Sequence, residues 1–169
     1  GEVTGSGMHG ATRLASNSLL EGLVFGAHAG RRASEEASRI DDSFHALPLE
    51  NPPHAATGEP LDLADIRNSL KALMWRSAGV RREGNRLAEA AADIDRWSHY
   101  VLPWQFSDPE GWELQNLLVV ARTMIEAAHR RQETRGVHLR SDFPRMDDEH
   151  WKRHVAFRRG EGGEVEVLV

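Results

Sequence analysis

Apolar side chains recur at helical spacing in three stretches of the chain between residues 62 and 135. Residues three or four positions apart lie on the same face of a helix, so each stretch predicts an amphipathic helix with one buried side. Three such helices with short connections bury one another in an antiparallel bundle. The predicted inward positions, helix by helix, are Ile66, Leu70, Leu73 and Met74, then Leu87, Ala91, Ile94 and Trp97, then Leu114, Leu117, Leu118, Ala121 and Ile125.

Capping and helix-breaking residues set the ends of these helices. Asp62 can accept hydrogen bonds from the first turn of a helix, and Pro109 suits a first-turn position because an N–H is not needed there. Pro103 cannot continue a helix, so it stops the second one. The expected helices therefore run from Asp62 to near Gly79, from about Glu83 to Tyr100, and from Ser107 or Asp108 to a point before Gly136.

A further apolar helix is expected after Ser16, Asn17 and Ser18, whose side chains can cap a helix N-terminus. A glycine-rich loop over residues 5–10 precedes it. Glycines also recur inside this helix, and each costs about 1 kcal/mol relative to alanine, which predicts close packing of another backbone. The apolar face of the helix consists of Leu19, Leu20, Leu23, Val24 and Ala27.

These patterns predict a mainly α fold class in four parts. Residues 1–33 form a loop plus a helix, and residues 34–61, which contain proline and glycine but no sustained period, form a linker. Residues 62–135 form the antiparallel three-helix bundle. Residues 136–169 form an irregular, extended tail, in which VAFRR and EVEVLV alternate around GEGG in the pattern of a short β-hairpin.

Composition excludes several classes of function. The formal net charge of −5 argues against a general nucleic-acid binder. The chain has no cysteine, which removes thiolate metal sites and disulfides. No apolar run reaches the roughly 20 residues that a membrane span needs, so we expect no membrane partner. The absence of cysteine fits a reducing cytoplasm, and we expect a cytoplasmic protein. His150 and His154 are four residues apart, but no third ligand accompanies them, so no metal site is predicted.

The glycine-rich loop carries the most informative chemistry. Its residues GSGMHG match G-x-G-x-x-G, but no helix begins inside the motif, so a dinucleotide-binding turn is not predicted. Arg13 lies between this loop and the next helix, where a guanidinium can hold a dicarboxylate in a two-pronged contact. His9 could reach the same substrate. The residues alone also allow a surface ion pair for Arg13 and one local hydrogen bond for His9.

This N-terminal segment resembles the flavoprotein family that contains the L-aspartate oxidases and the succinate dehydrogenase and fumarate reductase flavoprotein subunits. Members carry Gly-Glu-Val or Gly-Glu-Ala, then His-Gly-Ala-Asn-Arg, then Asn-Ser-Leu-Leu. The chain matches at residues 1–3, 9–13 and 17–20, and departs from the family at Thr12. Its segment TRGVHLRSDFPRMDDEHWKRHV, residues 134–155, also looks like the family segment that follows the helical bundle.

The resemblance implies that residues 1–33 are the C-terminal piece of an FAD-binding domain, whose remainder is missing from this chain. It implies FAD as the cofactor, in contact with Glu2, Ser18 and Leu19, the last two through their backbone N–H groups. No catalytic residue is expected in the chain, which should be inactive by itself. The implied substrate-binding residues are Arg13, Ser16 and His9.

Within the family, the residues ASNSLLEG at positions 15–22 look like the L-aspartate oxidase branch, because the succinate and fumarate enzymes favour Gly-Ala before Asn-Ser. That branch implies oxidation of L-aspartate to iminosuccinate with FAD, which oxygen or fumarate reoxidises. It implies binding of L-aspartate and other C4 dicarboxylates, and quinolinate synthase as the pathway partner that consumes the imine on the way to NAD. Two alternatives stay open: a succinate dehydrogenase or fumarate reductase flavoprotein fragment, and a non-catalytic helical interaction module.

Overall fold

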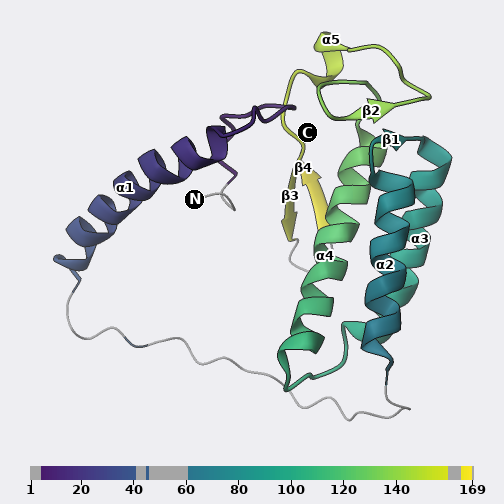
Figure 1. Cartoon of the computed structure of the whole chain (residues 1–169), viewed down its shortest axis with the longest axis horizontal. Coiled ribbons are helices and arrows are strands. Elements are labelled where there is room, and N and C mark those ends of the chain that lie inside the picture. The colour runs from purple at the N-terminus through teal and green to yellow at the C-terminus, as the bar shows by residue number, and fades with distance from the viewer. Residues whose placement is uncertain (1–4, 41–44, 46–60, 160–164, 169) are drawn as a thin grey trace. The chain divides into compact units, whose positions relative to one another are not determined.

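The computed structural model describes residues 5–40, 45, 61–159 and 165–168 of the chain. The chain consists of two compact units, residues 1–52 and residues 53–169. The mainly helical fold class is confirmed, and Figure 1 shows the elements of each unit. Among the described residues, no helix is long and apolar enough to cross a membrane.

The first unit contains one long helix, α1 (Asn17–Ala37). It continues four residues into the range predicted as a linker. Ion pairs one turn apart support this last part, with Arg32 to Glu35 at 3.4 Å and Arg39 to Glu36 at 3.0 Å. The glycines inside α1 have open space where a Cβ would lie, and its apolar residues are exposed. The close backbone neighbour that these glycines predict is therefore not found among the described residues.

The second unit is built on three helices that lie side by side, α2 (Leu63–Ala78), α3 (Gly84–Val101) and α4 (Pro109–Arg130) (Figure 1). Two of the three starts use an aspartate cap. Asp62 accepts from the N–H of Asp65 at 2.9 Å, and Asp108 accepts from the N–H of Gly111 at 2.9 Å. These two helices, α2 and α4, begin within about two residues of the predicted positions because the caps are local signals.

The inward faces of these helices form a single apolar core. Most predicted positions are buried or partly buried, and Ala90 and Val101 join them. Leu117 is a wrong prediction, because it remains 37% exposed. It lines a shallow hollow of about 280 Å³ on α4 together with Glu113, Asn116 and Val120. The buried core consists of Leu70, Leu73, Ala78, Leu87, Ala90, Ile94, Val101, Leu114, Leu118, Ala121, Ile125 and Ala128.

Residues 136–151 are not an extended tail, as the sequence predicted, but contain a strand and a short helix. β1 (Arg81–Arg82), between α2 and α3, pairs in parallel with β2 (Leu139–Arg140), so this segment closes one end of the bundle (Figure 1). The short helix α5 (Asp148–Trp151) comes next in the chain. Sequence periodicity could not reveal this packing, since it depends on pairing between residues almost 60 positions apart.

A short antiparallel hairpin ends the described chain. Its strands are β3 (Ala156–Arg159) and β4 (Val165–Leu168), and Ala156 lies opposite Leu168. The pairing occurs where the alternating sequence pattern predicts a β-hairpin.

Arg140 holds the closed end of the bundle together. Its side chain is almost fully buried, and its Nη1 donates to the carbonyls of Ala128 and His129 at 2.8 and 2.9 Å. These carbonyls belong to the last turn of α4, where backbone acceptors lack helical partners. Its Nε and Nη2 donate to both oxygens of Asp142 at 2.8 and 2.7 Å, and these bonds hold the pKa of that carboxyl well below its usual range.

Asp142 also links this cluster to the start of α3. Its Oδ2 accepts from the backbone N–H of Gly84 at 3.0 Å. The helix has no side-chain cap from its own N-cap residue, Glu83, so a carboxylate from a distant segment caps it instead. A Cβ at Gly84 would lie 2.9 Å from this oxygen, which explains the glycine.

A second buried charge, Glu133, organises the segment after α4. Arg131 and Arg135 donate to its Oε1 at 2.7 and 2.8 Å, and the Asp147 backbone N–H donates to its Oε2 at 2.9 Å. Burial by itself would raise the pKa of Glu133. The hydrogen bonds outweigh burial and lower this pKa to about 2.

His138 lies between these two clusters and is buried. Its Nδ1 pairs with Arg82 Nη1 at 2.8 Å and its Nε2 pairs with the Arg131 carbonyl at 3.0 Å. A guanidinium can only donate and a carbonyl can only accept, so this pattern requires the neutral imidazole with its proton on Nε2. Burial lowers the pKa of His138, and the positive charges of Arg82, Arg140 and Arg131 lower it further.

The start of α4 yields a test of packing. A Cβ at Gly111 would lie 2.1 Å from the ring of Phe106, whereas a Cβ at Gly30 in α1 meets nothing within 4 Å. We expect Gly111→Ala to lower the free energy of unfolding by about 1–3 kcal/mol, because an overpacked site must shift. Gly30→Ala should leave it unchanged or raise it. Urea denaturation measures both variants, and a neutral Gly111→Ala would contradict this packing.

His138 predicts a pH dependence of stability. Its pKa in the folded state lies below the ordinary value of 6.5, so the unfolded chain binds the proton more readily. The free energy of unfolding therefore has its full value above about pH 6.5. It falls as the pH drops from there through the folded-state pKa of His138. We expect wild type to lose more free energy of unfolding between pH 7 and pH 5 than His138→Gln does. The exposed His99→Gln is the control, and equal losses in wild type and His138→Gln would refute this origin.

Candidate functional site

The loop before α1 has an unusual backbone. Gly7 and Gly10 have φ angles of 73° and 58°, in the left-handed region that glycine tolerates. Ser16 has a φ of 67° there as well, which is uncommon for a residue with a side chain. Such residues concentrate at functional sites, where the surrounding structure holds them in place. The junction between loop and helix is therefore the first candidate site.

Ser16 occupies the N-cap position of α1 but does not cap it with its side chain. The expectation that the Ser16 side chain caps the helix is therefore wrong, and the backbone of Ser16 is left-handed at this position. The Ser16 carbonyl accepts from the Leu19 N–H at 3.1 Å, and the Leu14 carbonyl accepts from the Asn17 N–H at 3.3 Å. The described part of the chain offers no acceptor to the Ser18 N–H.

The first turn of α1 therefore presents a donor to its surroundings. Helix N-termini carry unpaired N–H groups and a partial positive charge, which suits an anion or an electron-rich carbonyl. Of the two amides predicted to face a cofactor, that of Leu19 is already engaged within the turn. The Ser18 amide fits the prediction better.

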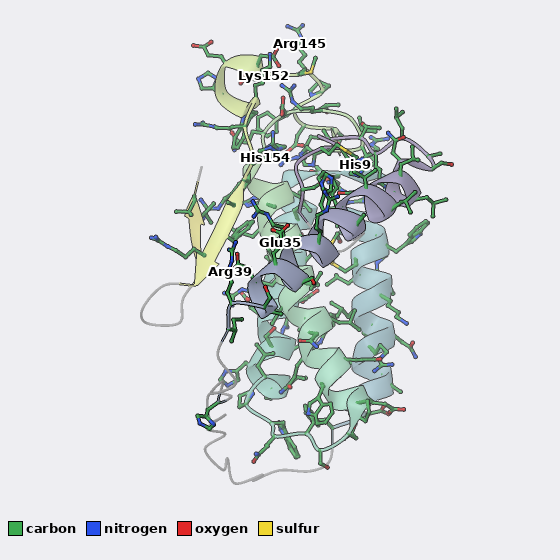
Figure 2. All side chains as sticks on the ribbon, turned by 90° about the vertical axis from the view of Figure 1, so that its left-hand side faces the viewer. His9, Glu35, Arg39, Arg145, Lys152 and His154 are labelled. Carbon is green, nitrogen blue, oxygen red and sulfur yellow. The ribbon has the colours of Figure 1, made fainter. Side chains whose placement is uncertain are left out.

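A buried carboxylate joins the loop to the helix. Glu21 lies in the second turn of α1, with a side chain that is 3% exposed. Its Oε1 accepts from the hydroxyl of Ser6 at 2.5 Å, and its Oε2 pairs with His9 Nε2 at 2.6 Å. The hydrogen bond from Ser6, followed by that from His9, lowers the pKa of Glu21, so this carboxyl is ionised. Figure 2 labels His9 beside α1.

The predicted site residues that the structure describes all lie within residues 9–19. His9 and Ser18 are half-buried, while Arg13, Ser16 and Leu19 are exposed. Glu2 lies outside the described residues. The described residues belong to one loop and one helix turn, so a single ligand can reach several of them.

Glu21 was not among the predicted site residues. It is the only charged residue between Asn17 and Gly30, inside a run that otherwise consists of apolar, small and neutral polar residues. A lone carboxylate in such a run is the signal that could have identified it, because burying a charge requires dedicated partners.

The histidine pair considered as a metal site is separated in the structure. His150 lies in α5, which ends at Trp151, so His154 does not follow on the same helix. The Nδ1 of His150 pairs with Asp147 Oδ2 at 2.9 Å. Across the described ranges, no group of three or more histidine, cysteine, aspartate or glutamate residues could hold a metal ion.

Comparison with known proteins identifies the family. Residues 67–168 match the family described as "Fumarate reductase flavoprotein C-term". Over 94% of its own length, the chain is 41% identical to the L-aspartate oxidase of Streptomyces coelicolor. Over 99% of its own length, it is 35% identical to the fumarate reductase flavoprotein subunit of Mycobacterium tuberculosis. It spans 29% of the first relative and 32% of the second.

Solved structures agree with this result. The Sdh1 complex of Mycobacterium smegmatis in its apo form contains a chain that is 26% identical, with a TM-score of 0.73 over 96% of this chain and 30% of that chain. The quinol fumarate reductase of E. coli shares the fold at 23% identity, with a TM-score of 0.74 over 96% of this chain and 31% of that chain. The chain therefore belongs to the fumarate reductase flavoprotein family, matches the C-terminal region of its members, and has L-aspartate oxidases among its relatives.

Proposed function

We propose that this chain is the C-terminal part of an L-aspartate oxidase, which oxidises L-aspartate to iminosuccinate with FAD. The observation that carries the proposal is the junction at residues 9–19. A loop with a histidine and an arginine runs into a helix whose first turn presents the Ser18 amide. The 41% identity to a relative named L-aspartate oxidase supports it.

Arg13 is proposed to hold a substrate carboxylate. Its guanidinium can donate two parallel hydrogen bonds to a carboxylate, which fixes the orientation of the substrate as well as its charge. Ser16 and His9 would contribute further polar contacts, and other C4 dicarboxylates fit the same chemistry. Nothing in this chain is proposed as a catalytic residue, so the fragment by itself would be inactive.

The residues present fit a flavin. Ser18 offers an amide whose hydrogen bond is not used by the described part of the chain, at the positive end of α1. We propose that Ser18, through its backbone amide, and Leu19, which follows it in the same turn, hold the flavin end of the cofactor and that Glu2 contacts its sugar hydroxyls. Bound FAD would supply the capacity to accept a hydride. Most other contacts to the cofactor would come from a dinucleotide-binding domain outside this chain.

The proposed reaction implies a pathway partner. An imine product is unstable in water, so a second enzyme must consume it promptly. Quinolinate synthase is the proposed partner in that step, which leads to NAD.

A second candidate is a succinate dehydrogenase or fumarate reductase flavoprotein. It is favoured by the 35% identity to the fumarate reductase flavoprotein subunit over nearly the whole chain. Ser16 argues for the oxidase, because its hydroxyl does not cap α1 and can contact the substrate instead. Comparing turnover of aspartate and of succinate by the full-length flavoprotein decides between the two.

The central prediction of this proposal concerns Arg13→Lys in the full-length flavoprotein. Lysine keeps the charge but loses the two-pronged geometry. We expect kcat/KM for aspartate to fall about 10²–10³-fold, since loss of a preorganised charge-stabilising contact costs about 2–4 kcal/mol. Flavin content and Tm should stay near wild type. Steady-state kinetics, flavin absorbance and thermal melting measure the three quantities.

The control is Arg31→Lys, the same substitution at an exposed position of α1. It should leave kcat/KM unchanged. Normal turnover in Arg13→Lys would show that this residue is not a substrate contact. Loss of flavin from Arg13→Lys would instead assign the residue to cofactor binding.

A further inference from the structure

We propose that Glu21 is the positioning residue of the substrate loop, and that it acts through His9. The inference rests on the proposed function, because it gives His9 a place in dicarboxylate binding. It concerns a residue that touches neither substrate nor cofactor in the proposal. The role of Glu21 is to hold the loop against α1.

The two side-chain partners of Glu21 both come from the loop and not from the helix. Ser6 donates to one carboxylate oxygen at 2.5 Å, and His9 occupies the other at 2.6 Å. The Ser6 hydroxyl in turn accepts from the Met8 backbone N–H at 3.3 Å. One buried carboxylate therefore fixes three successive points of a glycine-rich segment.

Burial makes this arrangement specific. A carboxylate that is 3% exposed must have its hydrogen bonds satisfied, or the folded state loses the solvation of the charge. The loop supplies those hydrogen bonds only when Ser6 and His9 are in place. These hydrogen bonds thereby restrict a loop that contains two left-handed glycines.

The pairing also sets the role of His9. The Glu21 carboxylate can only accept a hydrogen bond, so its contact with His9 Nε2 favours the imidazole tautomer that carries a proton on Nε2. Nδ1 is then the nitrogen left to meet a ligand. A carboxylate that orients a histidine in this way resembles the orienting groups behind catalytic and metal-binding histidines, which act through the ring and not by direct contact.

The test is a double-mutant cycle in the full-length flavoprotein. Glu21→Gln keeps the shape of the side chain but removes its charge, and His9→Gln removes the imidazole. The dissociation constant of succinate, a stable C4 dicarboxylate, is followed by the change that binding causes in the flavin spectrum. We expect each single variant to weaken binding about tenfold, with flavin content retained.

The double variant should bind no more weakly than His9→Gln alone, because Glu21 acts through His9. A merely structural role would give additive losses instead. Additive losses, or unchanged binding in Glu21→Gln, would overturn the inference. Glu36→Gln is the control, since it makes the same change at an exposed position of α1 and should bind as wild type does.

Amide hydrogen exchange over residues 5–16 provides a second measurement that does not require a ligand. Exchange should quicken in Glu21→Gln and in His9→Gln, and to no greater extent in the double variant. If the wild-type protein binds neither succinate nor aspartate, the proposed function is refuted. Hydrogen exchange would still decide whether Glu21 holds the loop. Unchanged exchange in Glu21→Gln would refute the positioning role.

Discussion

Three charged side chains, Glu21, Glu133 and Arg140, are buried in the described part of this protein, and each one requires a full set of polar partners. This requirement shapes the parts of the structure that have no regular helix. An unpaired buried charge would cost several kcal/mol, so the surrounding segments must adopt the conformations that supply its hydrogen bonds. The loop before α1 and the segment after α4 are both ordered in this way.

At the closed end of the bundle, Arg140 and Glu133 act on neighbouring segments. Arg140 satisfies carbonyls at the end of α4 and orients Asp142, which caps α3. Glu133 collects two guanidinium groups and a backbone amide. These contacts give an irregular polar segment a fixed place against the helices.

Sequence reasoning succeeded where the signals were local. The caps Asp62 and Asp108 located the starts of α2 and α4, and the apolar period located all three helices. It failed where hydrogen-bond partners lie far apart in the chain, as with Gly84 and Asp142. It also failed at Leu117, where the apolar face of α4 is wider than the surface that the neighbouring helices bury. In the candidate site, the family resemblance selected the loop and Arg13. The lone carboxylate in the α1 run could have marked Glu21, but its partners Ser6 and His9 depend on the fold of the loop and could not be read from the sequence.

We propose that the loop and the first turn of α1 form a dicarboxylate site beside a flavin. The most direct test is a crystal structure of the full-length flavoprotein with FAD and a bound C4 dicarboxylate. We predict the Arg13 guanidinium within hydrogen-bonding distance of a ligand carboxylate, the Ser18 amide against the flavin, and His9 still paired with Glu21. A dicarboxylate bound elsewhere, with Arg13 facing solvent, would contradict this assignment of the site.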